Sequence, residues 1–254
     1  MPEKKRVCLV GALGKMGIAI RSLLENDLDL FINARVDPAF DPQDGYRGID
    51  MISRGGEDVV INFSTPKATI EVASWCYERG HVPLVTGTTG LSENESNVLK
   101  EFSKKMPIIH DSNMSLGVNL IDALLPGLAN TLASEGWDTE ITELHHRMKK
   151  DSPSGTARRF ALTISLASGR RIIQGREKGH VSERGDEIFV HSVRGGTIPG
   201  EHTIYFMGPD EVIEIHHRAL SNKIFALGAV KAAKWIIGQK PGLYSMLDVL
   251  GLKK

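Results

Sequence analysis

Three glycines directly after a short apolar segment constrain the fold of this chain more than any other feature. The run from 7 to 10 is continuously apolar, and Gly11, Gly14 and Gly17 follow it at the start of a helical pattern. That order permits a tight turn after a buried strand, close approach of a ligand to the backbone, and close packing of helix on strand. The N–H groups at the helix start would then favour a pyrophosphate. The spacing is G-x-x-G-x-x-G rather than the commoner G-x-G-x-x-G, so glycine turns without a ligand remain an alternative.

An acidic residue follows at the distance that a dinucleotide site requires. Asp37 lies 20 residues after Gly17, at the end of a second apolar segment, where its carboxylate would accept hydrogen bonds from an adenosine ribose. No arginine directly follows Asp37 to receive a 2′-phosphate, although Arg35 is near, so the sequence leans weakly to NADH over NADPH. An exposed strand-end aspartate before Pro38 is the alternative interpretation.

The first half of the chain alternates continuous apolar runs with helical periodicity. Continuous runs indicate strands buried on both faces, as in a parallel sheet covered by helices. The expected strands are 7–10, 28–36, 59–63, 82–86 and 107–110, and the expected helices are 16–24 and 68–77. This order predicts an α/β fold with a Rossmann-like, doubly wound parallel sheet.

Two polar segments follow strands of this expected sheet. They are Thr86-Gly87-Thr88-Thr89-Gly90 and Asp111-Ser112-Asn113-Met114. Ligands of doubly wound sheets bind at the carboxyl ends of the strands, so both segments are expected to face the nicotinamide half of a cofactor. Turns without a ligand are an equally open interpretation.

The second half of the chain has a different character. We expect a helix over 116–132, interrupted by Pro126, an antiparallel strand over 137–146 and a helix over 157–167. Strands over 187–193, 203–207 and 212–216 follow, and a helix over 225–237 closes the chain. The pattern predicts an inserted α+β domain with a mixed or antiparallel sheet.

Charge and cysteine content argue against a protein that binds nucleic acid, membranes or metal ions. Lys and Arg total 31 and Asp and Glu total 31, so no net field draws in nucleic acid or an anionic membrane. We find no signal peptide and no uninterrupted apolar span of about 20 residues. Cys8 and Cys76 lack metal-binding spacing and are expected to be reduced and buried in a cytoplasmic protein, and no metal site is predicted.

The segment from 143 to 157 carries the most specific chemistry. Five of the six residues from His145 to Lys150 can carry positive charge, and Ser152-Pro153-Ser154-Gly155-Thr156 then opens a helix. With either Ser152 or Ser154 as N-cap, the N–H groups of Gly155 and Thr156 would be available to a carboxylate. Two adjacent anion-binding features predict a small substrate with two carboxylates, whereas a solvated basic loop with capping residues is the alternative.

Proton transfer could also come from this segment. A histidine such as His145 gives or takes a proton near neutral pH, and a lysine among other cations is a better acid. Both groups suit the reduction of an imine or carbonyl. His216-His217-Arg218 reads as a surface strand end, while Glu201, His202 and the Arg194-Gly195-Gly196 loop could approach a substrate.

The motifs in order resemble those of the dihydrodipicolinate reductase (4-hydroxy-tetrahydrodipicolinate reductase) family. The resemblance rests on Gly11-Ala-Leu-Gly-Lys-Met-Gly17, Thr86-Gly-Thr-Thr-Gly90, Asn113-Met-Ser-Leu-Gly-Val-Asn119, Glu143-Leu-His-His-Arg-Met-Lys-Lys-Asp-Ser-Pro-Ser-Gly-Thr-Ala157 and Gly200-Glu-His-Thr203. The glycine loop is unspecific, but the histidine-rich string is highly specific. The resemblance implies reduction of a cyclic dicarboxylate imine by NADH or NADPH in lysine and diaminopimelate biosynthesis.

The resemblance also implies roles for individual residues. His145 and Lys149 would form the catalytic acid pair. The substrate carboxylates would be held by His146, Lys149, Ser154, Gly155 and Thr156. The cofactor would be held by Gly11, Ala12, Leu13, Gly14, Lys15, Met16, Asp37, Gly87, Thr88, Thr89, Asp111, Ser112, Asn113 and Met114.

The family architecture implies a dinucleotide-binding domain over 1–114 and 224–254 and a substrate-binding and oligomerisation domain over 115–223. A homotetramer and closure of a hinge between the domains are implied as well. The chain departs from the family in a short 37–56 segment, in Met114 where many relatives carry an aromatic residue, and in lacking an arginine directly after Asp37. Relatives often accept both cofactors, so NADPH use stays open.

Two other functions remain possible from the residues alone. A dehydrogenase of an amino-dicarboxylate, such as aspartate dehydrogenase, would share the glycine loop but would not need the Ser-Pro-Ser-Gly-Thr cap. A non-catalytic dinucleotide sensor would have no reason to keep His145 and Lys149 together.

Overall fold

The chain forms two compact units, which are described separately below. The computed structural model describes residues 3–52, 56–175 and 184–253. Unit 1 comprises residues 1–116 and 222–254, and unit 2 comprises residues 117–221. Unit 1 is therefore discontinuous in sequence, and unit 2 is inserted into it.

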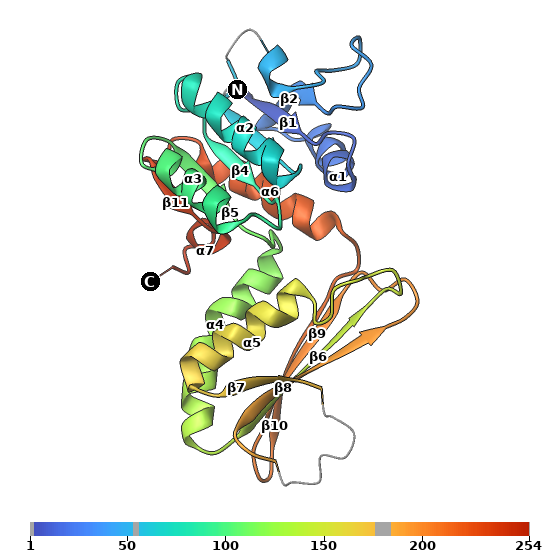
Figure 1. Cartoon of the computed structure of the whole chain (residues 1–254), viewed down its shortest axis with the longest axis vertical. Coiled ribbons are helices and arrows are strands. Elements are labelled where there is room, and N and C mark those ends of the chain that lie inside the picture. The colour runs from blue at the N-terminus through green and yellow to red at the C-terminus, as the bar shows by residue number, and fades with distance from the viewer. Residues whose placement is uncertain (1–2, 53–55, 176–183, 254) are drawn as a thin grey trace. The chain divides into compact units, whose positions relative to one another are not determined.

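Unit 1 is built on a parallel sheet in the strand order β11-β5-β4-β3-β1-β2 (Figure 1). Its strands are β1 (Lys5–Val10), β2 (Leu30–Val36), β3 (Val59–Asn62), β4 (Leu84–Thr86), β5 (Pro107–His110) and β11 (Gly242–Tyr244). The order reverses direction at β1, because β2 lies on one side of it and β3 on the other. A doubly wound sheet binds ligands at such a reversal, beyond the carboxyl ends of the strands.

Helices cover both faces of this sheet, as the uniformly buried strands require. The helices are α1 (Lys15–Leu24), η1 (Ile49–Met51), α2 (Pro66–Glu78), α3 (Glu93–Ser103), α6 (Lys223–Ile236) and α7 (Met246–Val249). One core joins Ile20 of α1 and Ala229 of α6 to the sheet. The other joins Trp75 of α2 and Leu99 of α3 to the opposite face. The C-terminal segment thus completes the unit that the N-terminal segment begins.

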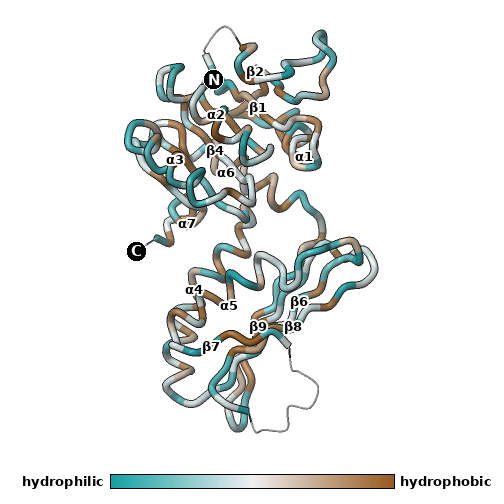
Figure 2. Tube along the Cα trace, in the orientation of Figure 1, coloured by the Kyte–Doolittle hydropathy of each residue, from teal (hydrophilic) through white to brown (hydrophobic). Residues whose placement is uncertain are grey.

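Unit 2 consists of a mixed sheet with two helices on one face. Its elements are α4 (Leu116–Ser134), β6 (Asp138–His145), α5 (Gly155–Ser168), β7 (Arg171–Gln174), β8 (Glu187–Arg194), β9 (Glu201–Met207) and β10 (Val212–Arg218). The strand order is β10-β9-β6-β8-β7. Alternate residues of β6 are buried, and Ile141 packs with Phe160 of α5 and Leu125 of α4. Hydrophobic colouring gathers along β4 and along β7 and β8 (Figure 2).

The predicted fold class is confirmed, with corrections in detail. The strand expected over 137–146 to be antiparallel is β6, which pairs antiparallel with β9 but parallel with β8. Helices α3 and α7 and strands β7 and β11 were not predicted, and the helix expected to close the chain, α6, is followed by β11 and α7. Helix α3 is polar on most of its surface and buries only Leu99 and Ser103 fully, so apolar periodicity is weak there. Its Ser92–Glu95 capping box is the sequence signal that marks its start.

Helix α4 corrects a second expectation, that the chain has no apolar span of membrane length. Among the described residues this one helix is long and apolar enough to cross a membrane by length and composition. It packs through Val118, Leu125 and Ala129 into the core of unit 2. It also buries Asp122, which is bonded to Arg159 of α5 at 2.7 Å. The helix therefore packs one face into the core of unit 2, whereas Leu120 and Leu124 are 47% and 54% exposed.

Candidate active site

The glycine loop lies between the end of β1 and the start of α1, and its packing requires glycine at two positions. Gly11 has a φ of +78°, and a Cβ there would lie 2.1 Å from the Phe63 carbonyl oxygen. A Cβ at Gly17 would lie 2.2 Å from the carbonyl oxygen of Gly11. Any side chain would push the loop off β3 or α1 off β1. The glycines therefore satisfy the steric requirement of a dinucleotide loop in this structure.

A cavity of about 360 Å³ opens beside this loop, entirely within unit 1. It is lined by Val10, Gly11, Gly14, Val36, Asp37, Pro38, Arg47, Gly48, Ile49, Phe63, Ser64, Thr65, Ala68, Glu71 and Val72. Gly14 is the N-cap of α1 and supplies no side-chain acceptor to the first helical turn. The amide groups of that turn thus suit the oxygens of a pyrophosphate, and the cavity fits the adenosine side of NADH or NADPH.

Asp37 is held rigidly at the wall of this cavity. One carboxylate oxygen accepts a hydrogen bond from the Leu13 N–H at 3.0 Å, and the other accepts one from the Ala39 N–H at 3.1 Å. The carboxylate therefore ties the glycine loop to the end of β2. It is placed where the sequence predicts a contact with ribose hydroxyls.

The Thr-Gly-Thr-Thr segment follows β4 and rests on a buried residue that the sequence analysis missed. Asn62, at the end of β3, is fully buried, and its side-chain amide donates to Thr86 Oγ1 at 3.0 Å and Thr88 Oγ1 at 3.3 Å. Gly87 packs against the Phe63 ring, 2.1 Å from where a Cβ would stand. These residues meet because β3 and β4 are adjacent parallel strands that end at the same edge of the sheet. The contact could not be predicted from the sequence, because the sequence does not show that β3 and β4 are neighbours. No described hydrogen bond fixes a role for Thr89.

The Asp111–Met114 segment follows β5 and is braced by the C-terminal helices. Asp111 accepts hydrogen bonds from the Asn113 N–H at 3.1 Å and from the Met246 N–H at 3.2 Å. Met114 is buried in the core of unit 1, and its carbonyl lies directly against Gly228 of α6. Packing rather than ring stacking is what the Met114 side chain contributes in this structure.

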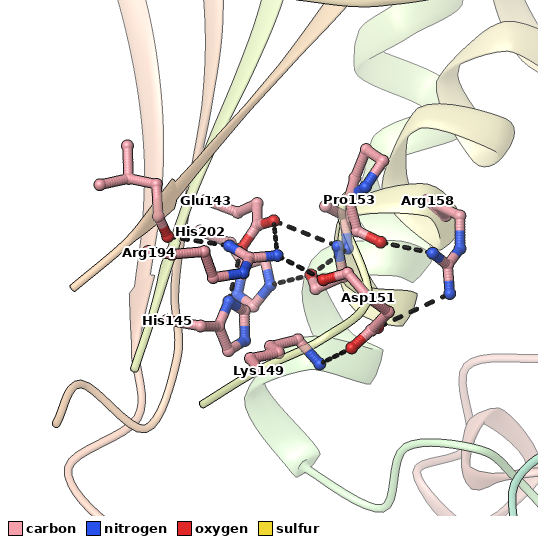
Figure 3. A network of polar contacts seen from close by, with 11 residues as sticks. Glu143, His145, Lys149, Asp151, Pro153, Arg158, Arg194 and His202 are labelled. Atoms are coloured by element: carbon pink, nitrogen blue, oxygen red, sulfur yellow. Dashed lines mark hydrogen bonds and ion pairs between the residues drawn. The ribbon is translucent and has the colours of Figure 1, made fainter. Parts of the chain in front are cut away.

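In unit 2, the register of the sheet gathers a second cluster around Glu143 (Figure 3). Glu143 and His145 lie two positions apart on β6 and so share a face. The pairing of β6 with β8 sets His145 opposite Arg194, and the pairing with β9 sets Glu143 opposite His202. All four side chains therefore meet at one end of the sheet, on the side that α5 approaches.

Glu143 is the centre of this cluster. Its side chain is fully buried and accepts from His145 Nδ1 at 2.5 Å, while Arg194 binds both carboxylate oxygens at 2.8 and 2.9 Å. The Ser154 N–H adds a bond of 3.1 Å. Burial alone would raise the pKa of Glu143, but the hydrogen bonds that it accepts hold it well below its usual range. The carboxylate is therefore charged and accepts only.

Ser154 is the N-cap of α5, which selects between the two serines that the sequence offered. Its hydroxyl accepts from the Ala157 N–H at 3.2 Å and lies 3.1 Å from His202 Nε2. Burial, with a smaller contribution from the nearby His145, lowers the pKa of His202 to about 3. His202 is thus neutral at physiological pH. His217 pairs with His202 in the β9–β10 register, and its half-buried ring is not the surface residue that the sequence suggested.

Lys149 corrects one sequence argument. The sequence placed this lysine among cations, but its ammonium group lies 2.8 Å from an Asp151 carboxylate oxygen. That hydrogen bond lowers the pKa of Asp151. Arg158 of α5 lies 3.8 Å from the same carboxylate and donates to the Pro153 carbonyl (Figure 3). The basic segment and the start of α5 are therefore joined through Asp151.

The structure thus separates the predicted residues into two groups. The glycine loop and Asp37 border one cavity of unit 1, with the Thr86–Gly90 segment behind Phe63. In unit 2, His145 and Ser154 meet through Glu143, and both His145 and Lys149 act electrostatically on His202. His146 is half-buried on the loop between them, with its N–H bound to the Ile198 carbonyl. The sequence analysis missed the position of Glu143 at the centre of its cluster and that of Arg47 in the lining of the cavity; alternation along β6 was the available signal for Glu143.

Comparisons with known proteins cover nearly the whole chain. The sequence model described as dihydrodipicolinate reductase, N-terminus, matches residues 5–114, and that described as dihydrodipicolinate reductase, C-terminus, matches residues 117–250. The chain is 43% identical over 249 residues to the 4-hydroxy-tetrahydrodipicolinate reductase of Caldanaerobacter subterraneus subsp. tengcongensis, covering 96% of this chain and 98% of that protein. It is 41% identical over 271 residues to the protein of that name from Aquifex aeolicus, with coverage of 97% and 99%.

A solved structure shares the fold. The dipicolinate-bound dihydrodipicolinate reductase from Paenisporosarcina sp. TG-14 superposes with a TM-score of 0.80 at 23% identity, covering 97% of this chain and 99% of that chain. The similarity therefore extends over both units.

Proposed function

Because the chain belongs to the dihydrodipicolinate reductase family, we propose that it reduces 4-hydroxy-tetrahydrodipicolinate to tetrahydrodipicolinate with NADH or NADPH, in lysine and diaminopimelate biosynthesis. The observation that carries the proposal is the Glu143 cluster, which fastens His145 to the N-terminus of α5. A site for a doubly charged small anion with an adjacent proton donor is what this reaction needs.

Unit 1 would hold the cofactor. The first turn of α1 would bind the pyrophosphate and Asp37 the adenosine ribose, while the segments 87–89 and 111–114 would face the nicotinamide. When bound, the reduced nicotinamide supplies the hydride. The rigid attachment of Asp37 to the Leu13 and Ala39 N–H groups orients its carboxylate before the ribose arrives.

Unit 2 would hold the substrate. The dipicolinate in the Paenisporosarcina protein carries two carboxylates, and two anion-binding features of unit 2 suit such a molecule. One carboxylate would face the first turn of α5 at Ser154, Gly155 and Thr156, and the other would face His146 and Lys149. Since Asp151 neutralises part of the charge of Lys149, the substrate would compete with Asp151 for that ammonium group.

The reaction replaces a hydroxyl by hydrogen, so a hydride is added and the hydroxyl leaves with a proton as water. His145 and Lys149 are the proposed donors of that proton, directly or through a water molecule. Ionised Glu143 only accepts, so His145 Nδ1 donates to it and Nε2 is the atom that exchanges a proton. A Cβ at Gly200 would lie 2.9 Å from Nε2, so glycine there leaves room beside the reactive nitrogen.

We further propose a homotetramer assembled through the face of the unit 2 sheet opposite α4 and α5. Val193 and Val212 on that face are 50% and 53% exposed, and the half-buried Leu144 and Tyr205 lie on it as well. A sheet face that leaves such apolar side chains uncovered is a candidate surface for contact with further copies of the chain. Light scattering of the purified protein tests this assembly, and a monomer at micromolar concentration would refute it.

A cytoplasmic location fits the state of the cysteines. Cys8 and Cys76 are both buried and unpaired, and burial raises the pKa of each thiol. Free thiols persist in a reducing compartment.

The direct test supplies purified protein with enzymatically generated 4-hydroxy-tetrahydrodipicolinate and follows the absorbance of NADH, then of NADPH. Rapid oxidation of either cofactor is expected. Oxidation only with oxaloacetate and ammonia, which together would be reduced to an amino-dicarboxylate, would indicate an aspartate dehydrogenase instead. Tight NADH binding without turnover of either substrate would indicate a dinucleotide sensor.

A further inference from the structure

The loop that follows β2 folds back, so that Tyr46 lies against the C-terminal end of that strand. The Tyr46 N–H donates to the Arg35 carbonyl at 2.8 Å, and the Asp37 N–H donates to the Tyr46 carbonyl at 2.9 Å. Gly45 makes this return possible, because a Cβ there would lie 2.9 Å from the Arg35 carbonyl oxygen and 2.8 Å from Phe40 Cδ2. The backbone therefore sets the residue after Tyr46 beside Asp37, independently of any side-chain conformation.

That residue is Arg47. Its Nε donates to the Pro38 carbonyl at 3.2 Å, which holds the side chain against the strand end. Arg47 and Asp37 both line the cavity next to the glycine loop. Among the described residues that line this cavity, Arg47 is the one cation, and Asp37 and Glu71 are the acidic residues. A guanidinium group and a carboxylate on adjacent backbone segments thus line the same cavity.

These two groups favour different cofactors. A carboxylate accepts hydrogen bonds from ribose hydroxyls but repels a 2′-phosphate, whereas a guanidinium binds phosphate oxygens with two parallel hydrogen bonds. Asp37 already accepts the Leu13 and Ala39 N–H groups, which offset part of its charge. A phosphate at this position therefore meets a guanidinium group, beside a carboxylate whose two oxygens already accept backbone hydrogen bonds.

We infer that Arg47 binds the 2′-phosphate of NADPH and lets this chain use NADPH as well as NADH, with Asp37 serving the ribose hydroxyls of NADH. The assignment rests on the proposed function, because it takes the cavity as the adenosine site of a nicotinamide cofactor. Arg47 comes from a returning loop, ten positions beyond Asp37, and so replaces the arginine that the sequence lacks directly after the aspartate.

The test compares Arg47→Ala, Arg47→Lys and the unchanged protein in binding 2′,5′-ADP and 5′-AMP by calorimetry. Since the two ligands differ in the 2′-phosphate, their affinity ratio isolates that group without any turnover. Arg47→Ala should weaken 2′,5′-ADP roughly tenfold to a hundredfold, the range for loss of a charged phosphate contact, and leave 5′-AMP within about twofold. Arg47→Lys should retain an intermediate affinity, because lysine keeps the charge but not the paired donors.

The control is Lys100→Ala, which removes a positive charge from an exposed position of α3 away from the cavity. It should leave both affinities unchanged, which separates a local contact from the loss of net charge. Equal weakening of both ligands by Arg47→Ala, or no change in either, would overturn the assignment. In parallel assays KM for NADPH should rise in Arg47→Ala while KM for NADH stays constant. If the unchanged protein reduces no substrate yet the ligand ratio shifts as expected, the proposed function fails and the assignment of Arg47 stands.

Discussion

Glu143 and His145 share one face of β6, and the Nδ1 atom of the histidine lies 2.5 Å from the buried carboxylate. The same carboxylate holds Arg194 and the N–H that begins α5. One acidic residue thus fixes the orientation of the proposed proton donor and the position of the proposed carboxylate site.

Glu143→Gln should lower kcat by roughly 10² to 10⁴, because an amide no longer fixes the tautomer of His145 or balances the charge of Arg194. NADH affinity should stay within about twofold, since the cofactor cavity belongs to unit 1. Glu187→Gln is the matched control, because Glu187 pairs with Arg171 at the opposite end of β8. Steady-state kinetics and NADH fluorescence measure both quantities, and unchanged kcat would remove Glu143 from the site.

Lys149→Ala should lower turnover by orders of magnitude while NADH affinity stays nearly intact. The reason is that Lys149 is a proposed proton donor and carboxylate ligand of unit 2, with no part in the cavity of unit 1. Arg171→Ala, an exposed cation of the same unit, controls for lost charge. Loss of NADH binding in Lys149→Ala, seen by fluorescence titration, would contradict this division of labour.

Asp37→Ala should weaken NADH more than NADPH, because the carboxylate serves a ribose hydroxyl but opposes a 2′-phosphate. The variant also frees the Leu13 and Ala39 N–H groups, so some loss for both cofactors is expected. Dissociation constants for the two cofactors give the ratio directly. Equal weakening would take Asp37 out of the ribose contact.

His202 makes the stability of unit 2 dependent on pH. Burial, with a smaller contribution from His145, lowers the pKa of His202 from its ordinary value of 6.5 to about 3 in the folded protein, so the unfolded chain binds more protons between these two pH values. The stability that the neutral ring of His202 gives the folded protein is therefore fully present above pH 6.5 and is lost progressively as the pH falls toward 3. Lowering the pH from 7 to 4.5 should cost about 1 to 3 kcal/mol through this group. Urea unfolding of His202→Phe should show a smaller pH dependence over that range; an unchanged slope would mean that His202 is not neutral when folded.

Two glycine substitutions in helices should have opposite effects. Gly228→Ala should destabilise unit 1 by at least about 2 kcal/mol, because its Cβ would stand 1.7 Å from the Met114 carbonyl oxygen and push α6 off the sheet. Gly127→Ala in α4 meets nothing within 4 Å and should stabilise by up to about 1 kcal/mol. Thermal unfolding of both variants checks the pair, and equal melting temperatures would refute the packing of α6 on Met114.

The fold class could be predicted from the sequence because buried parallel strands, glycine turns and helices each leave a pattern in residues that are close together along the chain. The strand at 107–110 and the helices near 16–24 and 157–167 were predicted close to their observed bounds. Helix α3 was not predicted because only a narrow stripe of its surface is apolar. The parallel pairing of β6 with β8 could not be predicted from the residues of β6. Buried and exposed side chains alternate along a strand in the same way whether its neighbour is parallel or antiparallel.

By itself the sequence determined which residue types were available: three glycines after a strand, Asp37, the histidine and lysine string, and a serine cap. The tertiary structure alone decided their partners. Strand register placed Arg194 and His202 around Glu143, although 51 and 59 positions separate them in sequence. Likewise, the return of the loop at Tyr46 placed Arg47 beside Asp37. Composition and spacing are local properties, whereas the charge that a side chain faces depends on which distant segments the hydrogen-bonded sheet brings next to it.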